Sequence, residues 1–567
     1  MSLTTSAQFR SDTEMRNAAE RILGHNTTRS STGTQLLRSD DALAVYGNDR
    51  GFVVTARDKR QRAVIGYSFT KFDEATLPCG LRWWLNASNK ALKENTNGTS
   101  TRLMAPLQRA SYSVVEPFIT TIWNQDRPYN YECPKVESTG LNCMTGCVAT
   151  ALAQAMYYYK YPEGAKFKAT YYVDSEEKTK SVNSTYKWAS MKDNYASTEK
   201  RLDESVKAVG TLMRDCGYAS EMDYSANGSS AYEYVMAPAI YQVFQYDSLA
   251  LRYFNREYYS DDEWYDIVYT ALENRQPVLF GGSTENYEGH EFLLCGINSD
   301  GLVYVNWGWG GNGDGYFDMN APRYYSKPFS QGQSVIVGMR PQKTPDNQDY
   351  YQSMWVADSI NFIVSDNPDT LWIQTPYLFN YSLLQFDGTV DVTLVDKSNH
   401  TAIRHLTVYD TNREPTIHVR ENEYNMADNE DEEDGEEDNG PIGPFYGYIF
   451  KEDVKDVEEE IIDTICVGGL RDVPEGIYSM YLTSFEKRDS ERQRVRVPGS
   501  QQIATLKKQA DGKILVSNDD VDDITATLNS PMNGRKCSTN VYSLSGHLFT
   551  RPVQRGVYIV NGRKIIR

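Results

Sequence analysis

The pattern of the sequence changes near residue 345, and this change constrains the fold more than any other feature. Before it, residues 112–342 are rich in Tyr, Trp and Gly and contain both helical and strand-like spacing. After it, short alternating segments such as 389–395 and 477–483 are separated by turn residues, as is typical of β-sandwiches. Because 567 residues also exceed what one hydrophobic core usually supports, we expect several domains, with an all-β region at the end.

The first 110 residues have a mixed α and β pattern of their own. Apolar spacing predicts helices over Asp12–Leu23 and Gly80–Glu94, and strands over Ala42–Tyr46 and Gly51–Ala56. The polar stretch Asn95–Arg102 is expected to be a linker. These patterns divide the chain into four segments, 4–111, 112–342, 346–510 and 511–567.

Charge and hydropathy argue against two classes of function. A net charge of −19 disfavours binding to nucleic acid, because a phosphate backbone needs clustered Lys and Arg. No apolar run approaches the ~20 residues that cross a bilayer, and no basic segment followed by an apolar one opens the sequence. We therefore expect no nucleic-acid partner, no transmembrane segment and no signal peptide within these residues.

Two further features have structural rather than catalytic interpretations. The acidic run between Glu421 and Gly440 repels itself and is expected to be a solvated loop; calcium binding is the alternative, although the ligand order of an EF-hand is missing. The eight cysteines are sparse and lack zinc-like spacing. Cys133 and Cys143 are near enough in sequence to form a local disulfide.

One cysteine lies where a nucleophile would be expected. Residues 142–156 pass from a Gly-containing loop into an Ala-rich helical pattern, which puts Cys147 at a helix start. Backbone N–H groups and the helix dipole favour a thiolate there and are expected to lower its pKa. The alternative is a small buried cysteine packed under a helix.

The histidines restrict the choice of a base. The chain has six, at positions 25, 290, 400, 405, 418 and 547, and only His290 lies within 112–342. A cysteine hydrolase centred on that segment would therefore use His290, which opens an apolar run expected to be a strand. A structural histidine is the alternative. Asn306 follows one strand later, across a turn at Asn298–Gly301, where an amide could orient the imidazole.

Trp307 follows Asn306 and could shield that pair from water, or it could simply be a core residue. The glycines that continue to Gly315 would let a loop run close to a substrate, and they form no phosphate-binding loop because no Lys-Ser or Lys-Thr follows. The backbone N–H of Cys147 is a candidate donor to an oxyanion.

Three motifs in this order, TGCVATALAQAMYYYKYP (145–162), EGHEFLLCG (288–296) and VNWGWGG (305–311), resemble the streptopain family of papain-like cysteine peptidases. WNQDRPYN (123–130), DCGYASEMDYSANGSSA (215–231) and VIGYSFTKFD (64–73) extend the resemblance over residues 40–342. It implies an α+β papain-like peptidase domain, an α+β inhibitory prosegment removed by proteolysis between Arg102 and Val114, and C-terminal all-β domains.

The resemblance also assigns roles to residues. Cys147 matches the nucleophile and His290 the base, while Asn306 and Trp307 match the motif that supports the histidine. Gln125, which could otherwise cap a loop, matches an oxyanion donor. The candidate substrate-binding residues are Met222, Asp223, Ser229, Ser230, Ala231 and Trp309. The family hydrolyses protein substrates, needs no cofactor or metal, and favours a bulky hydrophobic residue at the second position before the cleaved bond.

Some residues depart from the family pattern. Glu288 and Glu291 flank His290 where members often have Gly and Ala, which changes the electrostatics of the cleft. The long C-terminal part resembles the Bacteroidota branch, and residues 540–567 resemble sorting domains of the type IX secretion pathway. These features imply an exported or cell-surface zymogen that uses an export machinery. Two alternatives are a cell-wall amidase or transpeptidase with the same Cys and His, and an inactive adhesion protein.

Overall fold

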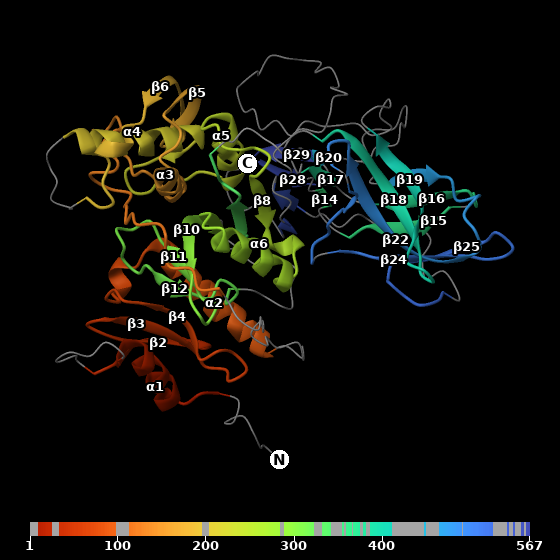
Figure 1. The fold of residues 1–567 in the computed structure, drawn as a ribbon, viewed down its shortest axis with the longest axis horizontal. Coiled ribbons are helices and arrows are strands. Elements are labelled where there is room, and N and C mark those ends of the chain that lie inside the picture. Colours follow the sequence, from red (N-terminus) through yellow and green to blue (C-terminus); the bar gives the residue numbers. More distant parts are fainter. Residues whose placement is uncertain are drawn as a thin grey trace. The chain divides into compact units, whose positions relative to one another are not determined.

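The computed structural model describes a large part of the chain in two compact units (Figure 1). The described residues are 9–24, 33–97, 113–195, 203–283, 289–322, 332–341, 354–356, 359–365, 367–374, 378–380, 386–410, 447–448, 464–489, 491–499, 501–524, 541–543, 548–549, 557–560 and 563–566. One unit consists of residues 1–256 and 261–344, and the other of residues 257–260 and 345–567. The acidic run and the expected activation bond lie outside the described residues.

The N-terminal segment folds as the spacing predicts. Helix α1 (Asp12–Leu23) begins with a capping box in which the Ser11 hydroxyl accepts from the Glu14 backbone and the Glu14 carboxylate accepts from the Ser11 backbone. Its apolar face packs on an antiparallel sheet, with Met15 and Ala19 fully buried. The sheet strands are β1 (Gln35–Ser39), β2 (Leu43–Asn48), β3 (Gly51–Ala56) and β4 (Val64–Ser68). Both predicted strands and the first predicted helix are confirmed.

The second predicted helix is longer than its apolar spacing indicated. Helix α2 spans Cys79–Asn97, so the polar residues from Asn95 to Asn97 are helical rather than part of a linker. Asn and Thr have only modestly lower helix propensity than Ala, and a polar segment can continue a helix that packing has already nucleated. The rest of the expected linker lies outside the described residues.

Residues 113–341 contribute helices and an antiparallel sheet. The helices are α3 (Cys147–Tyr159), α4 (Glu204–Ala219), α5 (Glu233–Gln242) and α6 (Asp261–Glu273). The strands of the main sheet are β8 (Arg252–Asn255), β9 (Val278–Ser283), β10 (Gly289–Ile297), β11 (Val303–Asn306), β12 (Gly315–Phe317) and β13 (Ser334–Val337), and a smaller sheet holds β5 (Gly164–Val173), β6 (Glu176–Thr185) and β7 (Asp223–Tyr224). The expected strand at His290 and the turn at Asn298–Gly301 are both present.

One sheet joins the N-terminal segment to the following domain. Its ten strands run in the order β1-β2-β3-β4-β12-β11-β10-β9-β13-β8, and the junction is the antiparallel pairing of β4 with β12. Gly66 of β4 allows this close fit, since a Cβ there would lie 2.5 Å from the Phe317 ring. Backbone hydrogen bonds therefore hold the N-terminal segment against the domain that carries the candidate site.

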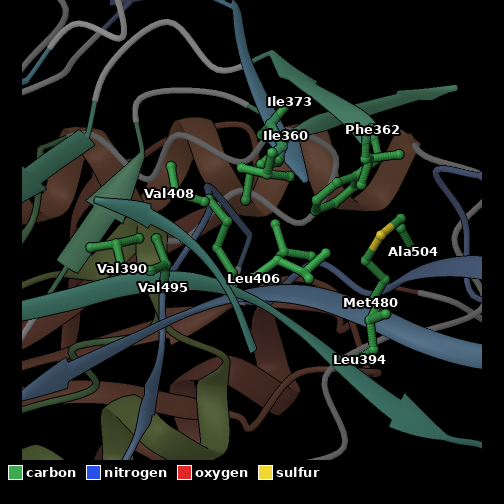
Figure 2. Packing of buried hydrophobic residues seen from close by; sticks show 14 of the residues in the cluster. Ile360, Phe362, Ile373, Val390, Leu394, Leu406, Val408, Met480, Val495 and Ala504 are labelled. Carbon is green, nitrogen blue, oxygen red and sulfur yellow. The ribbon is translucent and has the colours of Figure 1, made fainter. Parts of the chain in front are cut away.

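The second unit is built from antiparallel sheets around a shared apolar core (Figure 2). A six-stranded sheet contains β18 (Gly388–Asp396), β19 (Ala402–Asp410), β22 (Gly476–Glu486), β23 (Gln493–Arg494), β24 (Ala504–Lys508) and β25 (Ile514–Ser517). Three-stranded sheets contain β14 (Met354–Val356), β17 (Leu378–Asn380) and β20 (Gly447–Tyr448), and β15 (Asn361–Val364), β16 (Thr370–Gln374) and β21 (Thr464–Gly468). Phe362 and Ile373 of the latter pack in one cluster with Leu394 and Met480 of the larger sheet. This is the layered β packing that the alternating segments predict.

The larger sheet continues past residue 510, because β24 and β25 form a hairpin across that position. Beyond it, β26 (Val541–Ser543), β27 (Leu548–Phe549), β28 (Val557–Val560) and β29 (Arg563–Ile566) form a four-stranded antiparallel sheet. Among the helices that the structure describes, none is long and apolar enough to span a membrane.

Candidate active site

Cys147 is the first residue of α3, as the sequence predicts. The preceding Gly146 has φ 82°, and a Cβ there would lie 2.8 Å from the Met222 sulfur and 3.1 Å from the Ser229 carbonyl oxygen. Only glycine fits this turn without strain, because the backbone is left-handed and tightly packed at once. The helix is buried along most of its length, which fixes the direction of the Cys147 side chain.

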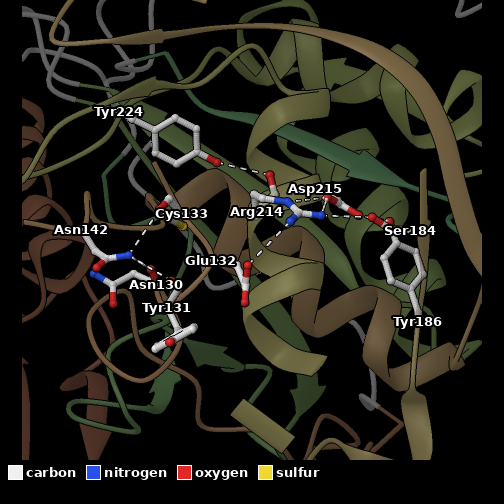
Figure 3. A network of polar contacts seen from close by, with 10 residues as sticks. All are labelled: Asn130, Tyr131, Glu132, Cys133, Asn142, Ser184, Tyr186, Arg214, Asp215 and Tyr224. Carbon is white, nitrogen blue, oxygen red and sulfur yellow. Dashed lines mark hydrogen bonds and ion pairs between the residues drawn. The ribbon is translucent and has the colours of Figure 1, made fainter. Parts of the chain in front are cut away.

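The loop that leads to Cys147 is held by polar contacts (Figure 3). Asn142 donates to three backbone carbonyls of this loop, at distances of 3.0 to 3.3 Å. The Arg214 guanidinium on α4 lies 3.8 Å from the Glu132 carboxylate and donates to buried Asp215 at 2.7 Å. Cys133 and Cys143 are both free thiols, so the disulfide that their spacing suggested is absent.

The Cys147 thiol has a raised pKa, contrary to the expectation from its helix position. Burial is the main cause and a negative charge at Cys79 adds to it, and together they raise the pKa of Cys147 to about 11. The backbone N–H groups of Glu291, Val148 and Cys147 itself act in the opposite direction, as expected at a helix start. Desolvation outweighs them, so at neutral pH the sulfur is a thiol.

His290 lies on β10 opposite Gly282 of β9. Burial, with a smaller effect from the positive charge of Arg82, lowers the pKa of His290 to about 4, so the imidazole is neutral at pH 7. Strand alternation puts His290 on the same face as Phe292, and α2 packs on that face. Both Cys147 and His290 are described, and no hydrogen bond joins the Cys147 sulfur to the His290 ring in this arrangement.

Asn306 pairs with Leu293 across the predicted hairpin, but its side chain does not orient His290. Its amide donates to the Thr121 carbonyl at 2.7 Å and exchanges hydrogen bonds of 3.2 Å with the Gln154 amide. The expectation of an Asn306–His290 contact is therefore not met here, because two other partners satisfy the amide. Trp307 is buried between Phe292 and Phe317 and donates to the Gly313 carbonyl at 3.0 Å.

Gln125 has an unpartnered donor in the interior. The residue is 5% exposed, and its side-chain nitrogen Nε2 has no hydrogen-bond partner. Its backbone carbonyl accepts from Thr145 at 3.0 Å, which ties Gln125 to the turn before Cys147. A buried amide donor without a partner costs free energy, and such a group is what an oxyanion site requires.

The candidate substrate-binding residues lie close to this turn but differ in exposure. Met222 is fully buried beneath Gly146, and the Ser229 hydroxyl donates to the Met144 carbonyl at 2.7 Å. Asp223 forms a backbone bridge with Ser230, which is exposed and is followed by partly exposed Ala231. Trp309 is partly exposed and donates toward the Cys79 sulfur. Of these residues, Met222 has no surface to offer a substrate in this arrangement.

The first turn of α2 lies near both candidate catalytic groups. Cys79 influences Cys147, and Arg82 influences His290, as the pKa shifts of those groups indicate. A Cβ on Gly80 would lie 2.8 Å from the Trp307 ring, and a Cβ on Gly282 would lie 2.4 Å from the Trp83 ring. The N-terminal segment is therefore packed against the site as well as paired with its sheet.

Glu291 and Glu233 are two neighbouring glutamates with buried carboxyl oxygens, and the Glu291 backbone contacts the Cys147 sulfur. Glu291 is one of the departures from the family pattern noted above, whereas Glu233, which lies 58 positions earlier and opens α5, was not predicted. An acidic residue in the first turn of a helix is so common that its position alone carries no signal for a site. Glu288 lies outside the described residues.

Comparison with known proteins assigns the family. Residues 123–317 match the model of the peptidase C10 family, and this range contains Gln125, Cys147, His290, Asn306 and Trp307. The chain belongs to the peptidase C10 family. The resemblance to streptopain-type peptidases is thereby confirmed, and the chain is a cysteine peptidase homologue with an α+β peptidase domain.

Relatives of the C10 chain include the thiol protease/hemagglutinin PrtT of Porphyromonas gingivalis, 31% identical over 52% of this chain and 36% of PrtT. Streptopain of Streptococcus pyogenes is 29% identical over 51% of this chain and 78% of streptopain. The chain thus spans about a third of the length of PrtT.

Two solved structures from Prevotella intermedia are also similar. A fragment of prointerpain A is 32% identical, covering 55% of this chain and 100% of the fragment, with a TM-score of 0.49. Active interpain A cysteine protease is 35% identical, covering 41% of this chain and 97% of that protein, with a TM-score of 0.36.

Proposed function

We propose that this chain is the latent precursor of a cysteine endopeptidase that hydrolyses peptide bonds in proteins, with Cys147 as nucleophile and His290 as base. The observation that carries the proposal is the position of Cys147 at the start of α3, after a turn that is hydrogen-bonded to the backbone of Gln125, a residue whose side-chain nitrogen is buried without a partner. Acyl transfer requires a nucleophile and an oxyanion donor, and Cys147 and Gln125 are the residues that we propose for these two roles.

The proposed reaction passes through an acyl-enzyme. The Cys147 thiolate attacks the scissile carbonyl carbon, and the Gln125 amide and the Cys147 backbone N–H donate to the developing oxyanion. The His290 imidazolium then protonates the leaving amine, and the C–N bond breaks. His290 next takes a proton from water, which attacks the thioester and releases Cys147. Asn306 and Trp307 are proposed to support the imidazole once the site is assembled.

Latency follows from the N-terminal segment, which we propose is an inhibitory prosegment. Helix α2 packs on the face of the sheet that carries His290, and no bond between His290 and Cys147 is present in this form. Activation would cut the chain between Arg102 and Val114 and free α2. His290 could then approach Cys147, and the ion pair needed for attack could form.

The direct test replaces Cys147 by Ala in the full chain. We expect loss of self-processing and of casein digestion, because the proposed acyl-enzyme is a thioester of the Cys147 sulfur. Cys216→Ala is the matched control, since it removes a different free thiol, which is buried on α4 away from the site. Casein digestion by purified Cys147→Ala at the wild-type rate would refute the assignment.

Two other functions make different predictions. A cell-wall amidase with the same residues would cleave peptidoglycan stem peptides and leave casein intact. An inactive adhesion protein would not be labelled at Cys147 by an epoxide inhibitor of cysteine peptidases after processing. Mass spectrometry of the labelled, processed chain would identify the modified residue.

We also propose that the precursor is exported and reaches the cell surface or the medium with the help of its C-terminal segment. The resemblance of residues 540–567 to sorting domains supports this proposal. From the family resemblance, we also propose that the enzyme prefers substrates with a hydrophobic residue at the second position before the cleaved bond. Digestion of a peptide library by the processed enzyme, read by mass spectrometry, tests that preference.

A further inference from the structure

Two carboxyl groups next to the candidate site take no part in the proposed reaction. Glu291 on β10 is 4% exposed, and its oxygen Oε1 has no hydrogen-bond partner. Glu233 is the first residue of α5; one of its oxygens accepts from the Ser334 hydroxyl, and the other is buried without a partner. Burying unpartnered carboxyl oxygens costs free energy, so their presence calls for a function.

The sheet is shaped to hold this acid pair, by which we mean Glu233 and Glu291. Glu291, Gly281 and Ser334 lie side by side on β10, β9 and β13 in register. A Cβ on Gly281 would lie 2.6 Å from the Glu233 carboxyl oxygen and 2.8 Å from the Ser334 hydroxyl. The glycine therefore leaves the space that the Glu233 carboxyl occupies above the sheet.

The acid pair is close to the reacting sulfur. The backbone N–H of Glu291 donates to the Cys147 sulfur, and a charge at Cys147 raises the pKa of Glu291. Strand alternation turns the Glu291 side chain away from the face of His290 and α2. Because the Glu291 backbone contacts the Cys147 sulfur, the acid pair lies within reach of a substrate side chain close to the bond that Cys147 attacks.

The pair lacks a cation. Burial raises the pKa of Glu233 to about 8 and that of Glu291 well above its ordinary value, and the negative charges of Glu233 and Cys147 add to the effect on Glu291. Within the described residues, no Lys, Arg or His pairs with either carboxyl group; Arg82 acts on His290 instead. A buried carboxyl pair without a counter-charge is neutralised by protonation or by an incoming cation.

We propose that Glu233 and Glu291 form a subsite for the Lys or Arg side chain of a substrate residue close to the cleaved bond. An ammonium or guanidinium group would donate to the unpartnered oxygens and supply the missing charge. The inference rests on the peptidase activity proposed above. If the subsite binds the second residue before the cleaved bond, the preference at that position is for Lys or Arg instead of the hydrophobic residue that the family resemblance implies.

The test uses the full chain after self-processing and a set of variants of one fluorogenic peptide, four for each position that is varied. The varied positions are the two residues before the cleaved bond and the two residues after it. Each position carries Lys, Arg, norleucine or Gln in turn. We expect wild type to prefer Lys or Arg over norleucine at one position, measured as a ratio of kcat/KM. Glu291→Gln and Glu233→Gln should each lower that ratio by about tenfold or more, because each leaves a bound cation with only one carboxylate.

The control is Glu137→Gln, which removes an exposed carboxylate of the same domain and should leave the ratio unchanged. Glu233→Gln is the decisive variant if Glu291→Gln fails to fold or process, since Glu233 does not contact Cys147. No basic preference in wild type at any position, or a preference in both variants as large as that of wild type, would overturn the subsite. Failure of wild type to cleave any peptide would refute the peptidase proposal instead, so the two failures are distinguishable.

Discussion

At the residue scale, the candidate site is defined by groups whose usual partners are missing. The Gln125 amide nitrogen is buried without an acceptor, and the Cys147 thiol and His290 imidazole are both neutral and unbonded to each other. By contrast, Asn306 is fully satisfied by Thr121 and Gln154. The Gln125 amide thus has a hydrogen-bond donor to offer, whereas no hydrogen bond joins the Cys147 sulfur, the His290 ring and the Asn306 amide in this form.

Gln125→Leu tests the donor. The variant removes a hydrogen bond that would exist only in the transition state, so kcat for a peptide should fall by about 100-fold while KM changes little. Thermal stability should be unchanged or higher, because an unsatisfied buried amide is replaced by an apolar group of similar size. A drop in stability with no change in kcat would show that Gln125 has a structural role only.

At the element scale, helix α2 and strand β4 form the contact between the proposed prosegment and the peptidase domain. β4 pairs with β12, and Trp83 of α2 packs against Gly282 and Phe292 on the sheet that carries His290. The N-terminal turns of this helix bring Cys79 toward Cys147 and Arg82 toward His290. In the proposed activation, release of α2 is therefore the step that we expect to be limiting.

Trp83→Ala should accelerate activation. Removing a buried tryptophan from a packed contact typically costs ~3–5 kcal/mol, and here most of the cost falls on the latent form. The rate of self-processing at fixed chain concentration, followed by gel electrophoresis, should rise several-fold. Lys93→Ala on the exposed side of the same helix is the control, because surface ion pairs contribute little to stability. Equal rates for wild type and Trp83→Ala would contradict the proposed blocking contact.

At the scale of the whole molecule, the described form is a chemically silent one. Burial holds the pKa of Cys147 at about 11 and that of His290 at about 4, so neither group carries a charge at neutral pH. For the cysteine, a raised pKa means that the thiolate is populated only as the pH rises toward 11. For the histidine, a lowered pKa means that the imidazolium appears only below about 4.

The rate of alkylation by iodoacetamide reports how much of the Cys147 thiol is ionised, because the thiolate is the reactive form. Brief incubation in the cold keeps the chain unprocessed during the measurement. In this unprocessed chain, the rate of alkylation at Cys147 should keep rising from about pH 7 to about pH 10 without a plateau. After processing, the rate at neutral pH should increase at least about tenfold, since an adjacent imidazolium and loss of burial both lower the pKa. Peptide mapping assigns the label, and Cys147→Ala gives the background from the other thiols. The same rate before and after processing would argue against prosegment control.

Short-range patterns in the sequence are enough to specify the local elements. The start of α3 at Cys147, the strand that carries His290, the hairpin to Asn306 and both early strands follow from a helix or strand period bounded by turn residues. The single histidine within 112–342 also limits the choice of base on the basis of sequence alone. These features need only neighbours along the chain.

The electrostatic state of the site and the contacts between distant segments depend instead on the tertiary structure. The helix position of Cys147 predicted a low pKa, but burial beneath packed elements raised it, because desolvation depends on every group around the sulfur. In the same way, the Asn306 amide is bound to Gln154, 152 positions away, instead of His290, and Glu233 meets Glu291 only through the fold. Short-range patterns specify which residues can act, whereas long-range packing specifies which of them are charged, partnered or able to react.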